Sequence, residues 1–245
     1  MLDDSRANAD HWLTGWQHLR LNISYTVSGN AQTFIFADLA GFTALTEAHG
    51  DARAAEVAGS FCQRVGELAG GMGAVLVKEI GDAALLRTHD AATAIELGLR
   101  ILESEDERSD SPAVRIGMHT GSAVERGGDW FGAAVNVAAR VAAIAAAGEV
   151  VLTDATADAA GLIEDVELER LGGRQLKNVL EPVELLRASR MGAHEGATRI
   201  DPVCRMSLAD GAWIGSLCFA GRRYYFCSMD CARKFTAEPE RYVSR

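Results

Sequence analysis

The sequence predicts an α+β fold, in which helices pack on a mixed β-sheet, followed by a small second domain. Apolar runs of strand length alternate with longer stretches of helical spacing, as in proteins whose helices cover a sheet. Two apolar runs, 74–79 and 82–86, are joined at Ile80-Gly81 and indicate a β-hairpin, so the sheet is not purely parallel. Four of the five cysteines fall after residue 200, where the charge balance also changes.

Composition limits the classes of function. The net charge of −10 argues against a general nucleic-acid or membrane-surface binder. Residues 191–245 hold 8 basic and 6 acidic side chains, whereas the rest of the chain carries a net charge of −12, which favours a domain boundary near residue 190. The richest apolar stretch, 133–147, is too short to span a membrane, and the start of the chain does not resemble a signal peptide. We therefore expect a cytoplasmic protein with no membrane or nucleic-acid partner.

Taken in order, the chain begins with an N-terminal arm over 1–30, where Trp12, Leu13, Trp16 and Leu19 have the spacing of a short amphipathic helix. The main domain is expected over 31–190, a small polar linker over 191–199 and the second domain over 200–245. The helices that we predict in the main domain cover 43–69, 91–103 and 130–147. The strands cover 33–38, 74–79, 82–86, 114–120, 149–153, 166–168 and 183–186. In the second domain, a hairpin over 213–227 precedes a helix over 229–235.

The stretch 34–43 combines features of a metal site and a phosphate site. An apolar strand ends at Asp38, a carboxylate that can hold a hard cation. Gly41 and Thr43 then open a helix, whose first N–H groups suit a phosphate. Taken alone, the stretch fits an ordinary strand, turn and helix with a solvated Asp38 better than a functional site.

Other polar residues stand out against apolar surroundings. Asp82 is a second carboxylate, directly after a glycine turn, and with Asp38 it could hold two hard cations. Asp129 precedes the alanine-rich helix and by default would cap it. Asn136 and Arg140 are four residues apart and project from one face of that helix. The alternative for this pair is a structural hydrogen bond within the core.

Four blocks of sequence resemble the class III nucleotidyl cyclase catalytic domain over about 33–187. They are Phe-Ala-Asp-Leu-Ala-Gly-Phe-Thr at 36–43, Lys-Glu-Ile-Gly-Asp at 78–82, Arg-Ile-Gly-Met-His-Thr-Gly at 115–121 and Asp-Trp-Phe-Gly-Ala-Ala-Val-Asn-Val-Ala-Ala-Arg at 129–140. The resemblance implies a ferredoxin-like sandwich that converts ATP to 3′,5′-cyclic AMP and pyrophosphate. It also implies a homodimer whose two active sites are built across the interface.

The resemblance assigns roles to individual residues. Asp38, Asp82 and the carbonyl of Leu39 would bind two Mg²⁺ or Mn²⁺ ions. Lys78 and Asp129 would read the base, and Asn136 and Arg140 would steady the ribose and the α-phosphate. The residues expected to contact the remaining phosphates are Gly41, Phe42, Thr43 and, on a weaker match, Lys177.

The base can be argued from hydrogen bonding. Asp129 can accept from the adenine N6 amino group, and Lys78 can donate to the adenine ring nitrogen. Guanine presents donors where lysine would need an acceptor, and an unpaired buried group costs about 1–3 kcal/mol. ATP is therefore preferred to GTP. The alternatives are a guanylate cyclase and a catalytically silent, cyclase-like dimer that acts as a signalling or binding module.

The tail resembles the YHS/TRASH family of small metal-binding modules, which implies a treble-clef-like, Cys-rich domain over about 200–243. Cys204 is followed after 22 residues by Cys227 and after three more by Cys231. These thiolates favour Zn²⁺ or Cu⁺ over Mg²⁺, with Cys218 as a candidate fourth ligand. We expect the metal or redox state of this domain to regulate the cyclase. The alternative is that the cysteines are small core residues of a protein-binding module.

Overall fold

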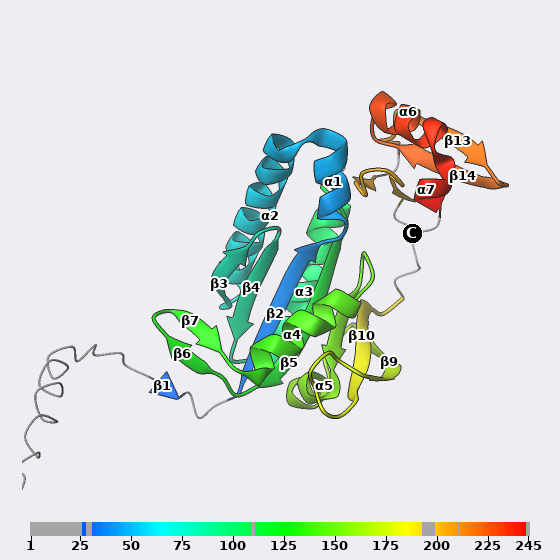
Figure 1. Ribbon diagram of the computed structural model, residues 1–245. Helices are drawn as coiled ribbons and strands as arrows, with labels where there is room; N and C mark the ends of the chain where they lie inside the picture. The colour runs from blue at the N-terminus through cyan, green and yellow to red at the C-terminus, as the bar shows by residue number, and fades with distance from the viewer. Residues whose placement is uncertain (1–25, 28–30, 109–110, 193–198, 210, 244–245) are drawn as a thin grey trace, which may run out of the picture.

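The computed structural model describes residues 26–27, 31–108, 111–192, 199–209 and 211–243. Its centre is a seven-stranded sheet with the order β3-β4-β2-β5-β8-β10-β9 (Figure 1). Only β5 and β8 pair in parallel, so the sheet is mixed, as predicted. The strands, in sheet order, are Val75–Ile80, Ala83–Thr88, Gln32–Leu39, Val114–Gly121, Val150–Thr153, Val183–Arg190 and Val166–Arg174.

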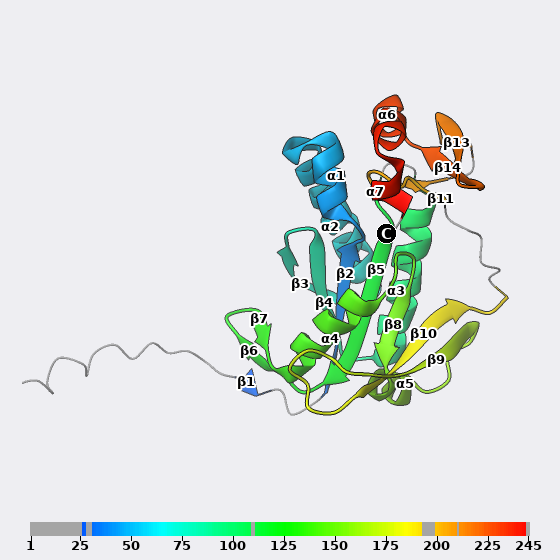
Figure 2. The same ribbon diagram turned by 45° about the vertical axis from the view of Figure 1, so that its right-hand side comes forward.

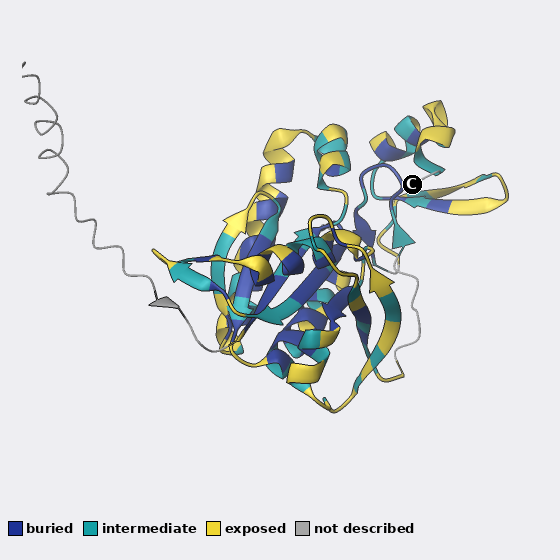
Figure 3. Ribbon diagram, turned by 60° about the horizontal axis from the view of Figure 1, so that its bottom comes forward, coloured by how far each residue is buried: buried dark blue, intermediate teal, exposed yellow. Residues whose placement is uncertain are grey.

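Helices cover both faces of this sheet. α2 (Asp51–Gly71), α3 (Ala91–Asp106) and α5 (Asp154–Ala160) share one face, and α4 (Ala133–Ile144) lies on the other. The strands separate the two cores by simple alternation. Ile35 and Leu86 pack in the cluster that contains α2 and α3, whereas their neighbours Phe34 and Leu85 pack with α4. Figure 3 shows the central strands as the most deeply buried part of the molecule.

The approach of α4 to the sheet depends on glycine in β5. A Cβ added to Gly117 would lie 1.9 Å from the backbone nitrogen of Ala142, closer than any real contact. At the C-terminal end of the strand, a Cβ on Gly121 would lie 3.0 Å from the Cβ of Ala134. Thus α4 runs along β5 in the opposite direction, and only a hydrogen atom fits between them at Gly117.

Two predicted helices have different boundaries in the structure. The helix expected over 43–69 is divided at Gly50, whose φ of 85° breaks the helix into α1 (Phe42–His49) and α2. The helix expected from Trp130 begins only at Ala133, because Trp130 belongs to β7 (Asp129–Phe131), which pairs with β6 (Val124–Arg126). There the indole packs against Phe34, with ring centroids 5.6 Å apart. Burial of this side chain therefore overrides the apolar helical pattern.

The N-terminal arm and the linker fall largely outside the described residues. The amphipathic helix expected over 12–19 lies outside them. The described part of the arm is β1 (Thr26–Val27), which pairs with β6. Residues 193–198 of the expected linker also lie outside the described part of the chain.

The tail forms a small domain with the predicted hairpin and helix. Its hairpin joins β13 (Gly215–Phe219) to β14 (Arg222–Phe226), and α6 (Met229–Ala237) and α7 (Pro239–Val243) follow. Phe235 lies fully buried within a group of aromatic rings. β11 (Arg199–Ile200) pairs with β12 (Ser207–Leu208).

The tail packs against the main domain at the end of the sheet where β2 stops and α1 starts (Figures 1 and 2). Met206 forms a β-bridge with Pro112, and the amide of Ser207 donates to the carbonyl of Ser111 at 3.0 Å. Buried side chains of the tail, among them Val203 and Met206, join the same hydrophobic cluster as the strands and helices of the main domain. The second domain therefore shares a core with the first.

Candidate active site and metal centre

The two candidate metal carboxylates lie side by side. Asp38, near the end of β2, pairs in register with Ala83 of β4, and Asp82 occupies the turn just before β4. The amide of Leu39 also donates to the carbonyl of Asp82 at 3.4 Å. Burial first, and then the negative charge of Asp38, raise the pKa of the Asp82 carboxyl. Two neighbouring carboxylates suit a divalent cation with oxygen ligands, so the donor set fits Mg²⁺ or Mn²⁺.

Arg115 is a member of this site that the sequence did not reveal. It lies directly across from Asp38 in the pairing of β2 with β5. Its guanidinium approaches one carboxylate oxygen of Asp38 through two nitrogens, at 2.7 and 2.5 Å. This contact orients the carboxylate from the side of the neighbouring strand. The alternation of side chains along the predicted strand 114–120 assigns Arg115 to one face of the sheet. Its partner Asp38 follows only from the register in which β5 pairs with β2.

The turn after β2 leads into the start of α1, where the sequence predicts phosphate contacts. Gly41 has a φ of 90° and is the N-cap of α1, and the amide of Leu45 closes the first helical turn on its carbonyl at 3.1 Å. The amides of Phe42 and Thr43 belong to this first turn, where N–H groups have no helical acceptor. Thr43 is exposed and Phe42 is half-buried. An anion would therefore meet free amides four and five residues after Asp38.

The residues expected to read the base form an ion pair. The ammonium of Lys78 in β3 lies 2.6 Å from the Asp129 carboxylate in β7. Its hydrogen bond lowers the pKa of Asp129. Asp129 does not cap the alanine-rich helix, because the N-cap of α4 is Gly132. Strand β3 and the β6–β7 hairpin thus present a cationic donor and an anionic acceptor next to each other.

Asn136 and Arg140 project from the side of α4 that faces away from the sheet. Asn136 is exposed and Arg140 half-buried, while Ala138 between them is fully buried. Within the described part of the chain, neither side chain has a hydrogen-bond or ion-pair partner, so the alternative of a structural bond in the core is wrong. Lys177 is exposed in the loop after β9, beside Leu176, which is buried in the cluster that includes residues of α4.

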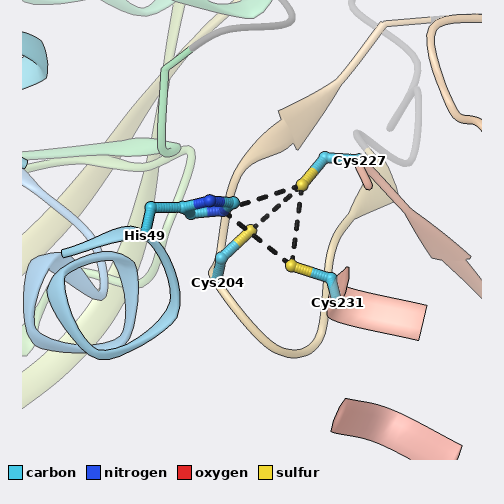
Figure 4. A group of neighbouring side chains, drawn as sticks. All are labelled: His49, Cys204, Cys227 and Cys231. Carbon is cyan, nitrogen blue, oxygen red and sulfur yellow. Dashed lines mark hydrogen bonds between the residues drawn. The ribbon is translucent and has the colours of Figure 1, made fainter. Parts of the chain in front are cut away.

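The tail contains a second cluster of metal-ligand type (Figure 4). The side chains of Cys204, Cys227, Cys231 and His49 converge, and one ligand atom from each lies within 4.8 Å of all the others. All five cysteines of the chain are free thiols. Cys218, the candidate fourth ligand, is exposed on β13 and does not belong to the cluster, so that expectation is wrong. The fourth member is a histidine at the end of α1.

Local hydrogen bonds hold the three cysteines in place. The fully buried Asp201 accepts from the amides of Cys227 and Val203, both at 2.8 Å. Ser228 caps α6 and accepts from the amide of Cys231 at 3.1 Å. Hydrogen bonds from Cys204 and Cys227 lower the pKa of Cys231, and the pKa of Cys204 is raised. The cluster therefore favours a thiolate at Cys231, as a metal ligand requires.

Family models match both parts of the chain. The adenylate and guanylate cyclase catalytic domain matches residues 25–184, and the YHS domain matches residues 199–245. The fold and the sites described above define the same class. The chain belongs to the adenylate and guanylate cyclase catalytic domain family, and a YHS domain follows its catalytic domain.

Named relatives agree with this assignment. A pH-sensitive adenylate cyclase of Mycobacterium tuberculosis is 36% identical over 173 residues, which are 68% of this chain and 41% of the relative. An adenylate cyclase of Streptomyces griseus is 40% identical over 110 residues, which are 45% of this chain and 28% of the relative. The chain thus spans less than half the length of either relative.

Solved structures support the fold. The adenylyl cyclase CyaB from P. aeruginosa has a TM-score of 0.59 at 19% identity, over 68% of this chain and 96% of that one. A Trypanosoma brucei adenylate cyclase, described in its monomeric state, has a TM-score of 0.61 at 20% identity, over 67% and 90%. A Silicibacter pomeroyi protein titled adenylate/guanylate cyclase/hydrolase has a TM-score of 0.55 at 26% identity, over 67% and 97%. None of the helices in the described part of the chain is long and apolar enough to cross a membrane.

Proposed function

We propose that this protein is an adenylate cyclase that converts ATP to 3′,5′-cyclic AMP and pyrophosphate. The observation that carries the proposal is the pairing of Lys78 with Asp129 at 2.6 Å. A donor and an acceptor next to each other match the adjacent N1 acceptor and N6 donor of adenine. Guanine would place its N1–H against the ammonium of Lys78. The names of the two bacterial relatives point to the same substrate.

The reaction proposed at this site is an in-line displacement at the α-phosphorus. The ribose 3′-oxygen forms a bond to that phosphorus, the bond to the β-phosphate oxygen breaks, and the 3′-hydroxyl proton passes to solvent. Two Mg²⁺ or Mn²⁺ ions at Asp38 and Asp82, with Leu39 as a further carbonyl ligand, would supply Lewis-acid chemistry at the 3′-oxygen and the phosphates.

The chain's own groups position the triphosphate. The amides of Phe42 and Thr43, opened by Gly41, donate to phosphate oxygens, and Lys177 contacts the β- and γ-phosphates. Asn136 steadies the ribose, and Arg140 offsets the charge that develops on the α-phosphate.

The proposed enzyme works as a homodimer. Asn136 and Arg140 face away from the sheet that bears Asp38, so their substrate contacts suit a site completed by a second copy. Ile80 at the end of β3 and Phe131 at the end of β7 are apolar side chains with 44% and 52% exposure. A second subunit could bury this apolar surface. Each subunit would then give its carboxylates to one site and its α4 residues to the other.

The YHS domain is proposed to bind a thiophilic ion, Zn²⁺ or Cu⁺, through Cys204, Cys227 and Cys231. Soft thiolates favour these ions over the Mg²⁺ or Mn²⁺ of the carboxylate site. The metal or redox state of the cluster would then adjust the cyclase.

Purified protein tested with ATP and with GTP, each with Mg²⁺ and with Mn²⁺, decides between the candidate functions. We expect cyclic AMP as the main product. A clear preference for GTP would make the protein a guanylate cyclase and refute the assignment of Lys78 and Asp129. The absence of any cyclic nucleotide under all four conditions would favour a silent binding module.

A further inference from the structure

We propose that His49 of the catalytic domain is the fourth ligand of the YHS-domain metal, so that one ion clamps the two domains together and restrains the loop at the start of α1. The functional part of this inference rests on the proposed cyclase activity. The clamp itself depends only on the side chains in Figure 4.

The distances fit a tetrahedral site. The sulfur of Cys227 lies 3.4 Å from that of Cys204 and 3.7 Å from that of Cys231. The Nε2 atom of His49 lies 4.0 Å from the Cys227 sulfur and 3.9 Å from the Cys231 sulfur. A tetrahedral Zn²⁺ with ordinary bond lengths sets sulfur–sulfur edges of about 3.8 Å and sulfur–nitrogen edges of about 3.6 Å. These four separations are close to the tetrahedral values, and all four ligand atoms lie within 4.8 Å of one another.

The ligand set is of the closed, structural type. Three cysteines and one histidine fill all four positions of Zn²⁺ and leave none for substrate. Among the described residues, the YHS domain itself supplies three members of this cluster, and the fourth comes from the catalytic domain. His49 is less buried than Cys204 and Cys231, so the histidine side offers a path for the ion.

Contacts around the cluster hold the same two domains together. The ammonium of Lys234 in α6 donates to the carbonyl of Ala48 at 2.9 Å, at the C-terminal end of α1, where helix carbonyls lack intrahelical donors. Arg241 approaches Glu47 at 3.6 Å on the surface. The last turn of α1 is thus bonded to the YHS domain through a backbone carbonyl and, when the ion is bound, through His49.

The YHS domain also contacts Gly41, the N-cap of α1 in the turn after β2. Arg205 follows the ligand Cys204, and its aliphatic stem packs on Gly41. A Cβ added to Gly41 would lie 2.5 Å from Cγ of Arg205. α1 has only eight residues, with Phe42 at one end and His49 at the other. The metal-bound YHS domain therefore holds α1 at both ends, next to Asp38 and the free amides.

The test measures metal affinity in the full-length chain under reducing conditions, by competition with a chromophoric chelator. We expect one Zn²⁺ per wild-type chain and affinity lower by about 100-fold in His49→Ala, since a water replaces a ligand of the closed site. His49→Cys restores a four-ligand site and most of the affinity. Cys218→Ser, which changes a cysteine outside the cluster, binds Zn²⁺ as the wild type does.

Two spectroscopic readouts complete the experiment. The Co²⁺-loaded wild type shows tetrahedral visible bands, which change in His49→Ala. Amide hydrogen exchange over 38–50 slows when Zn²⁺ binds the wild type but not when it binds His49→Ala.

Wild-type affinity and an unchanged Co²⁺ spectrum in His49→Ala would overturn the clamp, as would a wild type that takes up no metal. Equal exchange over 38–50 with and without Zn²⁺ would refute the restraint of the loop. None of these readouts requires cyclase activity, so they separate failure of the clamp from failure of the proposed function.

Discussion

Mixing two inactive variants tests whether the active site is shared between subunits. Along α4, Asn136 and Arg140 each lie about 200° around the helix from Ala138, at about 100° per residue. Ala138 is fully buried toward the sheet, so both polar side chains point the opposite way. The carboxylate of Asp38 lies on the sheet beside Arg115. If Arg140 of one subunit completes the site that contains Asp38 of the other subunit, then Asp38→Ala and Arg140→Ala remove residues from different halves of each site.

The expected recovery follows from the symmetry of the dimer. Each variant alone should lose at least about 100-fold in kcat, because each removes a group that stabilises charge in the transition state. In an equimolar mixture with free subunit exchange, about half of the dimers contain one copy of each variant. Each such dimer has one intact site of two, so the mixture should reach about 25% of wild-type activity.

The assay measures cyclic AMP formation after subunit exchange, with differently tagged copies to confirm that mixed dimers form. A mixture of Asp38→Ala with Asp82→Ala is the matched control. Both changes affect the same half of the site, so its mixed dimers contain no intact site and should stay inactive. If mixed dimers of Asp38→Ala and Arg140→Ala form without recovering activity, the shared site is refuted.

Three further predictions follow from single contacts. Gly117→Ala should destabilise the protein by about 2–3 kcal/mol in urea unfolding, because the new Cβ would lie 1.9 Å from a backbone nitrogen of α4; Gly59→Ala, with open space around it, should not. Glu96→Gln should cost about 2 kcal/mol at neutral pH, after allowance for partial exposure, because hydrogen bonds from Arg190 lower the pKa of Glu96 to about 2. That stability is present above pH 4.5, the ordinary value, and is lost as the pH falls toward 2, so the urea midpoint should fall more over this range in the wild type than in the variant. Lys78→Met should lower kcat/KM for ATP by about 10- to 100-fold in the cyclase assay without improving use of ATP over GTP, and unchanged kinetics would refute its role at the base.

Features that depend on local pattern could be predicted from the sequence. The β3–β4 hairpin follows from two apolar runs around a glycine, and the mixed sheet follows from that hairpin together with the helical segments. The juxtaposition of Lys78 with Asp129 could be anticipated only through resemblance, because the two lie on different hairpins. Helix boundaries were less predictable. Gly50 divides a continuous apolar pattern, and Trp130 leaves the helical pattern because its ring is buried against Phe34.

The residues that the sequence did not reveal share one physical property, which is that tertiary packing alone gives them a role. Arg115 meets Asp38 through strand register, and Arg205 meets Gly41 through domain packing. His49 lies 178 residues before Cys227 and ends a helix, where a histidine already has an ordinary favourable interaction with the helix dipole. Local spacing identified Cys227 and Cys231 because a single turn of chain places both. A ligand that another domain contributes cannot be identified from local spacing, because its position depends on how the two domains pack. Here the shared core around Val203 and Met206 places His49 next to the three cysteines.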